Sequence, residues 1–326
     1  MKILQVTEGR EFRVYDAEIP TAGPGEVLMR IEAVTTCPQW DLHLRHAEPM
    51  FVGHQFVYPY APGQPGHEAT GYVEAVGEGV AESPFAVAVG ERVSAWKDAG
   101  HQRQGCYAQY VVHKAEHLIP VPYRLSFAAT APVELAMCVG AAVLRMKGMD
   151  LIEGRRLGVM GLGPAGLIAG QMLLAEGAAH IVGFDLNPVR WEHATKVGFD
   201  ETCDPTGEAG ERFPLRSSGP VLDSIIDCVG ARASVQWAMD RARDTVQLFG
   251  VQREEYAFGV RHYTLRLSGY PGHSREAAEY AVSLMERGAL DLAPLVTREL
   301  PLEAYAEGID LLERQEAIKI CYFPWR

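Results

Sequence analysis

The chain has 326 residues, of which 48% are hydrophobic and 22% are charged, a balance typical of a globular protein rather than a disordered one. Asp and Glu outnumber Lys and Arg by 42 to 30, which gives a formal charge of −12 and no basic cluster, so nucleic acid is excluded as a partner. The six cysteines contain no CxxC pair, which excludes a disulfide framework and favours a reducing compartment.

Membrane insertion is not expected. Residues 1–12 lack the apolar core of a signal peptide. The apolar run Leu157–Ala175 is interrupted by glycines and a proline, which suit a strand, a turn and a helix better than a membrane span. We therefore expect a cytoplasmic protein.

The first 125 residues are predicted to form a compact β-rich unit. Apolar residues alternate with polar ones from Val27 to Ala33, the period-two pattern of a half-buried strand. Gly- and Pro-rich turns punctuate this part of the chain, as at 22–25 and 61–66. Further strands are expected at Arg13–Ile19, Ala69–Val76, Glu91–Trp96 and Tyr107–His113.

From Ser126 onward, short apolar runs alternate with helical stretches, a pattern typical of a parallel sheet covered by helices. The expected strands are Leu157–Met160, His180–Phe184, Asp223–Val229, Thr245–Val251 and Leu265–Ser268, and the expected helices are Pro164–Glu176, Pro188–Val197, Arg275–Arg287 and Leu302–Arg314. The segment Ile318–Phe323 is expected to return to the β-rich unit. We predict an α/β protein with one domain of residues 1–125 and 290–326 and a second domain of residues 126–289.

A glycine-rich turn with the sequence Gly161-Leu162-Gly163-Pro164-Ala165-Gly166 joins a predicted strand to a predicted helix. Its glycines permit a tight turn, a close approach of a pyrophosphate and close packing of helix on strand. Asp185 ends the next predicted strand, where a carboxylate can bind the adenosine ribose and repel a 2′-phosphate. We therefore predict NAD rather than NADP, while Arg190 nearby is able to accept a phosphate. The alternative is a packing turn that binds nothing.

Residues that end later strands of the same sheet are expected to lie near the nicotinamide half of the dinucleotide. This expectation comes from position in the predicted sheet and not from a motif. The residues are Val229, Gly230, Gly250, Val251 and Ser268.

The β-rich unit also contains residue types that bind transition metals. Cys37 is followed by Asp41 and His43, and His67-Glu68 comes later. Thiolate, imidazole and carboxylate suit a tetrahedral zinc ion with one position open for substrate. Each residue alone is weak support, because single cysteines and histidines usually serve in packing or at the surface. The prediction depends on the combination.

The segment Gly66–Val80, with the sequence GHEATGYVEAVGEGV, carries the most specific resemblance in the chain. Together with Gly90–Val93 and the glycine-rich turn, it resembles the zinc-dependent medium-chain dehydrogenases/reductases, the group of alcohol, sorbitol and threonine dehydrogenases. The resemblance covers essentially the whole chain. It implies a GroES-like catalytic domain, a Rossmann domain and an active site in the cleft between them. It also implies that Cys37 and His67 bind catalytic zinc, with Glu68 as a permanent or alternating ligand.

The chain departs from the usual pattern of that family around the first ligand. Where the family has Cys-Gly-Thr/Ser-Asp-x-His, residues 37–43 read CPQWDLH, which is one residue longer and lacks the hydroxyl that starts a proton relay. Asp41 is expected to be a partner behind the metal ligands, and His43 is expected to be the base of the relay. An alternative is a relative that keeps the ligand residues and binds no metal.

The fourth ligand position of the family falls near Glu134, with Cys138 as the weaker candidate. A solvated carboxylate at a helix start is an equally good interpretation of Glu134. Residues 94–104 are too few for the lobe in which relatives hold a structural zinc with four cysteines. We therefore expect one catalytic zinc and no structural zinc.

Several other residues receive a structural interpretation. His101, His113 and His117 are interpreted as surface residues, and Cys106, Cys203, Cys228 and Cys321 as packing thiols. Aromatic residues and histidines between Cys37 and His67 either line a pocket for a bulky or cyclic alcohol or pack an extended loop, and packing is slightly favoured. They are Trp40, His46, Phe51, His54, Phe56, Tyr58 and Tyr60.

The predicted reaction is zinc-assisted transfer of a hydride between NAD and an alcohol or polyol, or the matching ketone or aldehyde. The alternatives are a zinc-independent enzyme of the quinone-reductase type and a non-catalytic nucleotide-binding protein. A homodimer is expected through an apolar edge strand at Leu265–Ser268. The alternative is a monomer whose edge is covered by the helix Arg275–Arg287.

Overall fold

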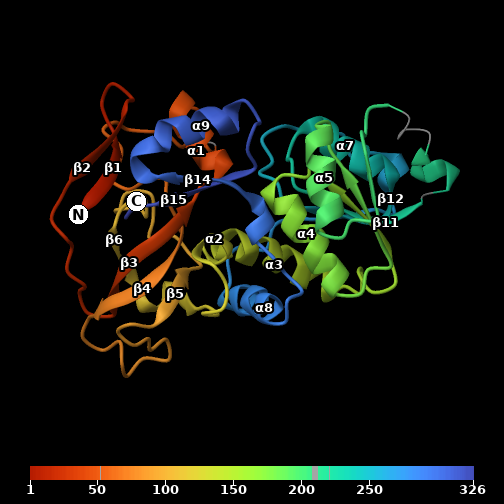
Figure 1. Ribbon diagram of the computed structural model, residues 1–326. Helices are drawn as coiled ribbons and strands as arrows, with labels where there is room; N and C mark the ends of the chain where they lie inside the picture. The colour runs from red at the N-terminus through yellow and green to blue at the C-terminus, as the bar shows by residue number, and fades with distance from the viewer. Residues whose placement is uncertain (52, 208–211, 220) are drawn as a thin grey trace. The chain divides into compact units, whose positions relative to one another are not determined.

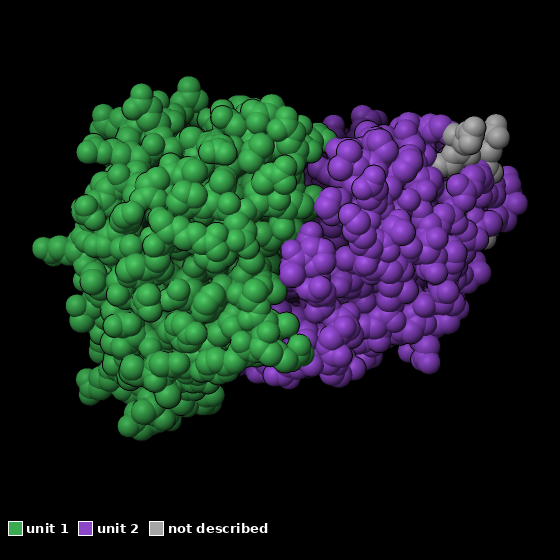
Figure 2. All heavy atoms as spheres, viewed as in Figure 1, with its two compact units in different colours: residues 1–135, 295–326 green, residues 136–294 purple. Residues whose placement is uncertain are grey.

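The computed structural model describes residues 1–51, 53–207, 212–219 and 221–326 (Figure 1). The chain forms two compact units, which are coloured separately in Figure 2. Unit 1 contains residues 1–135 and 295–326, and unit 2 contains residues 136–294. Each unit has its own large sheet.

Within the described residues of unit 1, the larger sheet has the strand order β14-β15-β3-β4-β5-β7, and β6 also pairs with β3. Its pairs are antiparallel except for β14 with β15. A separate hairpin is formed by β1 (Lys2–Val6) and β2 (Phe12–Asp16). The strands of the larger sheet are β3 (Glu26–Thr35), β4 (Glu68–Val76), β5 (Arg92–Ala95), β6 (Tyr110–Lys114), β7 (Leu118–Pro120), β14 (Val296–Pro301) and β15 (Lys319–Phe323).

Strand β3 organises this sheet because it pairs with β4, β6 and β15. Val27, Met29 and Ile31 are fully buried, as their alternation with polar residues predicts. The pairing with β15 also confirms that the end of the chain returns to the β-rich unit. The C-terminal end of β3 therefore lies between β4 and β15, which are both distant from it in sequence.

Three helices of unit 1 are α1 (Pro38–His46), α2 (Phe127–Thr130) and α9 (Tyr305–Glu313), and α3 (Val133–Lys147) begins there. Helix α1 was not among the elements expected from the sequence. It starts with Pro38 in the first turn, where the missing N–H costs no hydrogen bond, and it ends at Ala47 in the left-handed conformation. The helix accommodates the extra residue of the CPQWDLH segment.

The sheet of unit 2 has the strand order β10-β9-β8-β11-β12-β13 in the described part of the chain, and all its pairs are parallel. The first strand of this unit, β8, is central: β9 and β10 follow on one side of it, and β11, β12 and β13 on the other, as in Rossmann folds. The strands are β8 (Arg156–Met160), β9 (His180–Phe184), β10 (Glu201–Cys203), β11 (Leu222–Asp227), β12 (Ala242–Leu248) and β13 (Arg266–Ser268).

Helices cover this sheet (Figure 1). Helix α4 packs against β8 and β9, and α7 packs against β11 and β12. The helices of unit 2 that frame the sheet are α4 (Pro164–Ala175), α5 (Pro188–Lys196), α7 (Arg232–Arg241) and α8 (Arg275–Glu286). The predicted alternation of strands and helices is confirmed.

The segment Leu157–Ala175 forms strand β8, a turn and helix α4, as expected. One other helical stretch, Phe127–Lys147, is long and apolar enough to cross a membrane. However, 83% of its most apolar window is buried inside the structure, which is typical of a core helix.

Candidate functional site

Three neighbouring strands of unit 1 bring the predicted metal ligands together. Thr35, at the end of β3, lies opposite Glu68 at the start of β4 and opposite Cys321 in β15. Cys37 follows β3 by two residues, and His67 immediately precedes β4. The ligand atoms of Cys37, His67 and Glu68 consequently lie within 4.8 Å of one another.

The imidazole of His67 is oriented by the backbone. Its Nδ1 lies 2.8 Å from the carbonyl oxygen of Pro65, and its Nε2 lies 3.7 Å from Oε2 of Glu134. Burial alone would lower the pKa of His67, but a hydrogen bond with Cys37 and the charges of Glu134 and Glu68 raise it well above its usual value. A proton on Nδ1 leaves Nε2 available as a metal ligand, in the arrangement common to metal-binding histidines.

Glu134 is buried, with only 6% of its surface exposed, although it lies in the first turn of helix α3. The interpretation of this residue as a solvated carboxylate is therefore wrong. Its Oε2 lies beside the Nε2 of His67. The thiol of Cys37, the imidazole of His67 and the carboxylate of Glu68 form a donor set that fits a divalent metal ion, and Glu134 adds a second carboxylate next to His67.

Glu68 is held by residues that the sequence analysis missed. Lys319 Nζ lies 2.7 Å from Oε1 and 2.6 Å from Oε2 of Glu68, and both side chains are fully buried. Thr35 Oγ1 donates a hydrogen bond to Oε2 at 2.9 Å, and Lys319 also donates to the carbonyl of Thr36. Burial raises the pKa of Glu68, and the charge of Lys319 opposes this effect. The available signal was a lysine at the start of the apolar strand KICYF.

Asp41 is fully buried behind this cluster. Its carboxylate accepts hydrogen bonds from the hydroxyl groups of Tyr107, at 2.9 Å, and Tyr305, at 2.5 Å. Burial raises its pKa to about 6, while the two hydroxyl groups and the positive charge of His67 act in the opposite direction. Asp41 therefore acts on His67 through its charge, because the Nδ1 of His67 is bonded to Pro65. The two tyrosines were not identified from the sequence.

His43 lies near the C-terminal end of helix α1. Its Nδ1 is 3.1 Å from the carbonyl oxygen of Glu48, and its charge acts on His54. The structure thus places His43 beside the segment that follows α1, and its role as a relay base stays a prediction.

The interpretation of His113 as a surface residue is wrong, since only 1% of it is exposed. Its Nε2 lies 3.5 Å from Sγ of Cys106, and burial lowers the pKa of His113 to about 4. His101 and His117 are half-buried. Among the predicted packing thiols, Cys106, Cys203 and Cys321 are buried and Cys228 is half-buried.

The glycine-rich turn of unit 2 has the backbone that its sequence predicts. Gly161 has a φ of 87°, which disfavours other residues. A Cβ on Gly166 would lie 1.8 Å from the carbonyl oxygen of Gly161, whereas a Cβ on Gly163 would meet nothing within 4 Å. Gly163 is also the N-cap of α4. The helix therefore packs tightly on the turn, while its N-terminus is open to an anion.

Asp185 follows β9 and has polar contacts on both carboxylate oxygens. The N–H of Leu162 donates to Oδ2 and the N–H of Asn187 donates to Oδ1, each at 2.8 Å. Arg190 Nη1 lies 3.2 Å from Oδ2. Asp185 thus links the turn to helix α5, and its charge is paired with that of Arg190.

The ends of β11 and β12 meet beside the turn. A Cβ on Gly161 would lie 2.6 Å from Cγ2 of Val229, and a Cβ on Gly250 would lie 2.4 Å from the nitrogen of Gly230. Asp227, which the sequence analysis missed, accepts a hydrogen bond from Gly230 N–H at 2.8 Å. Val229 and Val251 are exposed, and Ser268 is the half-buried last residue of β13.

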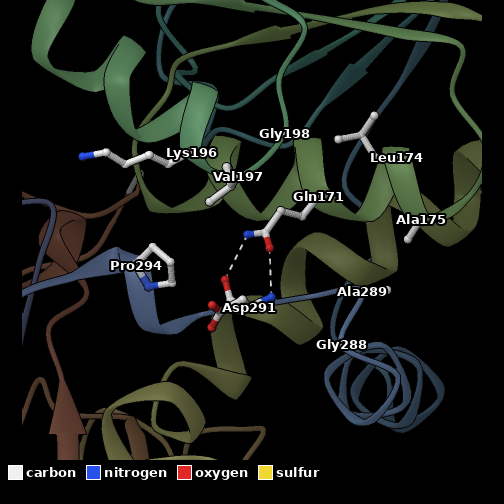
Figure 3. A pocket seen from close by; sticks show the side chains of 10 residues that line it. All are labelled: Gln171, Leu174, Ala175, Lys196, Val197, Gly198, Gly288, Ala289, Asp291 and Pro294. Carbon is white, nitrogen blue, oxygen red and sulfur yellow. Dashed lines mark hydrogen bonds between the residues drawn. The ribbon is translucent and has the colours of Figure 1, made fainter.

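Unit 2 has a pocket between the C-terminal half of α4 and residues 288–294 (Figure 3). The Gln171 amide donates to the carbonyl of Asp291 at 3.0 Å and accepts from its N–H at 2.9 Å. These bonds, drawn in Figure 3, use the amide of Gln171 to tie α4 to the segment after α8. We assign no function to this pocket.

Comparison with known proteins finds a matching family model in each unit. Residues 23–123 match the family model of the alcohol dehydrogenase GroES-like domain, and residues 164–269 match that of the zinc-binding dehydrogenases. The chain is 26% identical to sorbitol dehydrogenase of Homo sapiens over 340 residues, which covers 95% of this chain and 92% of the relative.

Solved structures resemble the whole chain. The 2R,3R-butanediol dehydrogenase from Bacillus subtilis has a TM-score of 0.82 and 24% identity, with 99% of each chain covered. A zinc-binding dehydrogenase from Sinorhizobium meliloti 1021, solved with NADP, has a TM-score of 0.80 and 21% identity, again with 99% of each chain covered. At these identities the structures establish the fold.

Proposed function

Because the chain belongs to the zinc-type medium-chain dehydrogenase/reductase family, we propose that it transfers a hydride between an alcohol or polyol and NAD with the help of zinc bound in unit 1. The reverse reaction reduces the matching ketone or aldehyde. The observation that carries this proposal is the convergence of Cys37, His67 and two buried carboxylates. A cytoplasmic location is part of the proposal.

We propose Cys37 Sγ, His67 Nε2 and the carboxylate of Glu134 as the zinc ligands. Glu68 is the alternating member, because Lys319 and Thr35 already occupy both of its oxygens. Three protein ligands leave one position of a tetrahedral ion for substrate, as in other catalytic zinc sites. When bound, zinc supplies a Lewis acid that lowers the pKa of an alcohol, and NAD supplies the acceptor for its hydride.

The residues of the chain prepare this site before any substrate arrives. The carbonyl oxygen of Pro65 fixes the ring of His67. The positive charge of Lys319 compensates the negative charge of Glu68, so that only one of the two carboxylates adds a net charge to the cluster. Asp41 adds a partly ionised carboxylate behind His67. The imidazole therefore keeps its position and its basicity as a ligand.

NAD is proposed over NADP because Asp185 is the carboxylate at the end of β9 and Arg190 is already paired with it. A 2′-phosphate would meet the charge of Asp185 and would have to compete for Arg190. The open N-terminus of α4 at Gly163 is the proposed site of the pyrophosphate.

We also propose a single zinc ion per chain and a homodimer. The segment 94–104 contains no cysteine, whereas a structural zinc site needs several thiolates. Strand β13 is an edge of the unit 2 sheet, and Val260 and Tyr263 before it are 89% and 81% exposed. An exposed edge flanked by apolar side chains is suited to pairing with a second copy.

The proposed function is tested by following NADH formation with a panel of linear, branched and cyclic alcohols and polyols. We expect turnover with at least one of them, loss of turnover on chelation and recovery on adding zinc. Substitutions Cys37→Ser, His67→Ala and Glu134→Gln are expected to lower the zinc content of the purified protein, which is measured by elemental analysis. Full turnover in the presence of a chelator would instead identify a zinc-independent reductase.

A further inference from the structure

Four aromatic rings gather on the surface of unit 1 beside the first metal ligand. The ring of Trp40 lies against that of His101, with centroids 4.1 Å apart and planes inclined by 32°. His54 and Phe56 meet Trp40 edge-on, at centroid distances of 5.6 Å and 6.2 Å. We call Trp40, His54, Phe56 and His101 the aromatic face.

Helix α1 sets the direction of this face. Cys37 is the N-cap of the helix, and Trp40 lies in its first turn, three residues after Cys37. The next residue, Asp41, is fully buried with its carboxylate bonded to Tyr107 and Tyr305. The helix therefore buries Asp41, while the ring of Trp40 in the preceding position is only half-buried.

The two imidazoles of the aromatic face have similar surroundings. Burial lowers the pKa of His101, and the charge of His67 acts in the same direction. Burial also lowers the pKa of His54. Its Nδ1 accepts the N–H of Met50 at 3.2 Å. The aromatic face thus consists of the rings of Trp40 and Phe56 and of two imidazoles whose pKa is lowered by burial.

The segment behind the face is fixed by separate contacts. Tyr60 is buried in a small core with Val6 and Leu44, and Phe56 and Tyr58 pack against that core. The hydroxyl of Tyr58 donates to the carbonyl of Leu44 at 2.7 Å. Residues 56–60 are therefore held in place by Tyr58 and Tyr60, without a contribution from the half-buried rings of Trp40 and His101.

We propose that Trp40 and His101, supported by His54 and Phe56, form the surface on which the carbon skeleton of the substrate lies, and that the enzyme prefers a cyclic or aromatic alcohol to a linear polyol. This rests on the proposed function. Aromatic rings attract apolar rings through offset stacking and edge contacts. The hydroxyl groups of a polyol would lose water against such a surface without gaining hydrogen bonds from the ring faces, which disfavours binding. The preference for packing in the sequence analysis thus applies to Tyr58 and Tyr60 and not to Trp40.

The test compares kcat/KM for cyclohexanol, benzyl alcohol and sorbitol in the zinc-loaded enzyme and in Trp40→Leu. We expect the ring alcohols to be favoured by more than about tenfold, and Trp40→Leu to lower their kcat/KM by about 10- to 100-fold with little change for sorbitol. A wild-type preference for sorbitol, or an equal loss for all three alcohols in the variant, overturns the proposal.

The matched control is Trp325→Leu, the same substitution in the same unit. Trp325 is 41% exposed, and its indole N–H donates to the carbonyl of Ile31 at 2.7 Å, so it tests the cost of losing a tryptophan outside the aromatic face. We expect its substrate preference to equal that of the wild type. His101→Ala, which replaces a half-buried loop residue, repeats the test if Trp40→Leu does not fold.

A binding measurement separates failure of this inference from failure of the proposed function. Saturation-transfer NMR follows cyclohexanol and sorbitol on the zinc-loaded protein without NAD, and so it needs no turnover. A cyclohexanol signal that is stronger than that of sorbitol and falls in Trp40→Leu supports the aromatic face even if no alcohol is oxidised. Equal signals for the two alcohols, or a cyclohexanol signal unchanged in the variant, overturn it even if alcohols are oxidised.

Discussion

Lys319 and Glu68 form an ion pair that is fully buried, and the two residues are 251 positions apart in the sequence. Removing one partner of such a pair leaves the other charge without compensation in a low-dielectric environment. We predict that Lys319→Met lowers the free energy of unfolding of the metal-free protein by about 3–5 kcal/mol, measured by urea denaturation.

The control for this prediction removes both charges. In Lys319→Met/Glu68→Gln no uncompensated charge remains, so we expect the double variant to regain most of the lost stability. If the double variant is less stable than Lys319→Met by the full cost of a second independent substitution, the two residues do not interact as described.

Asp41 makes the stability of unit 1 depend on pH. Its pKa in the folded protein is about 6, above the value of 3.8 for a free aspartate side chain, so the folded state binds the proton more tightly than the unfolded state. This contribution is complete below the unfolded pKa and is lost as pH rises toward 6. We predict that the stability of Asp41→Asn relative to the wild type increases by about 2 kcal/mol between pH 4 and pH 7. Denaturation of the metal-free proteins at both pH values measures the change, and a constant difference contradicts the raised pKa.

Asp185 is the residue on which the choice of dinucleotide depends. Asp185→Asn keeps an oxygen for the N–H of Leu162, removes the charge and releases Arg190 from its ion pair. We predict that the ratio of NADPH to NADH affinity rises by about tenfold or more, because repulsion of the 2′-phosphate disappears and a guanidinium becomes available. Fluorescence titration with each reduced dinucleotide measures the ratio. An unchanged ratio would show that Asp185 does not face the ribose.

At the level of elements, the turn between β8 and α4 offers a matched pair of glycine substitutions. Gly166→Ala places a methyl group 1.8 Å from the carbonyl oxygen of Gly161, whereas Gly163→Ala places it in open space. We predict that Gly166→Ala lowers the midpoint of thermal unfolding, and that Gly163→Ala unfolds like the wild type but binds NADH more weakly because its methyl group occupies the anion site. Calorimetry and NADH titration distinguish the two, and equal effects on stability would contradict the packing described.

The regular elements were predictable because their patterns are local. Alternation identified β3, and strand, turn and helix together identified the segment around Gly161, so the Rossmann sheet followed from the sequence. Helix α1 was missed because its nine residues carry a proline, a tryptophan, an aspartate and two histidines, which weaken the helix signal of its two leucines, its glutamine and its arginine. Its tertiary contacts, through Asp41 and Leu44, override that weak propensity.

The candidate site was predictable in part for the same reason. Cys37, His67 and Glu68 belong to recognisable sequence segments of the first 80 residues, and the pairing of β3 with β4 brings them together in space. Lys319 and Tyr305 reach the site from the last strands and helices of the chain, and no local signal encodes such a distance. The return of residues 318–323 to the β-rich unit was expected, but the pairing of β15 with β3, which brings Lys319 to the site, was not.

For the whole molecule, the exposed edge at β13 predicts self-association. Light scattering at micromolar concentration is expected to give twice the chain mass of 35.8 kDa. Tyr263→Glu, which places a charge on the 81% exposed side chain before the edge strand, is expected to shift the mass toward that of one chain. A wild-type mass near 35.8 kDa contradicts the proposed dimer.

We predict that oxidation of an alcohol by this chain requires one zinc ion held by Cys37, His67 and Glu134. The rate of NADH formation from an accepted alcohol, followed as zinc is added stepwise to metal-free protein, tests this prediction. We expect no activity without zinc, a linear rise and a plateau at one equivalent of zinc per chain. Activity that is complete in the metal-free protein, or that requires a second equivalent, would contradict this prediction.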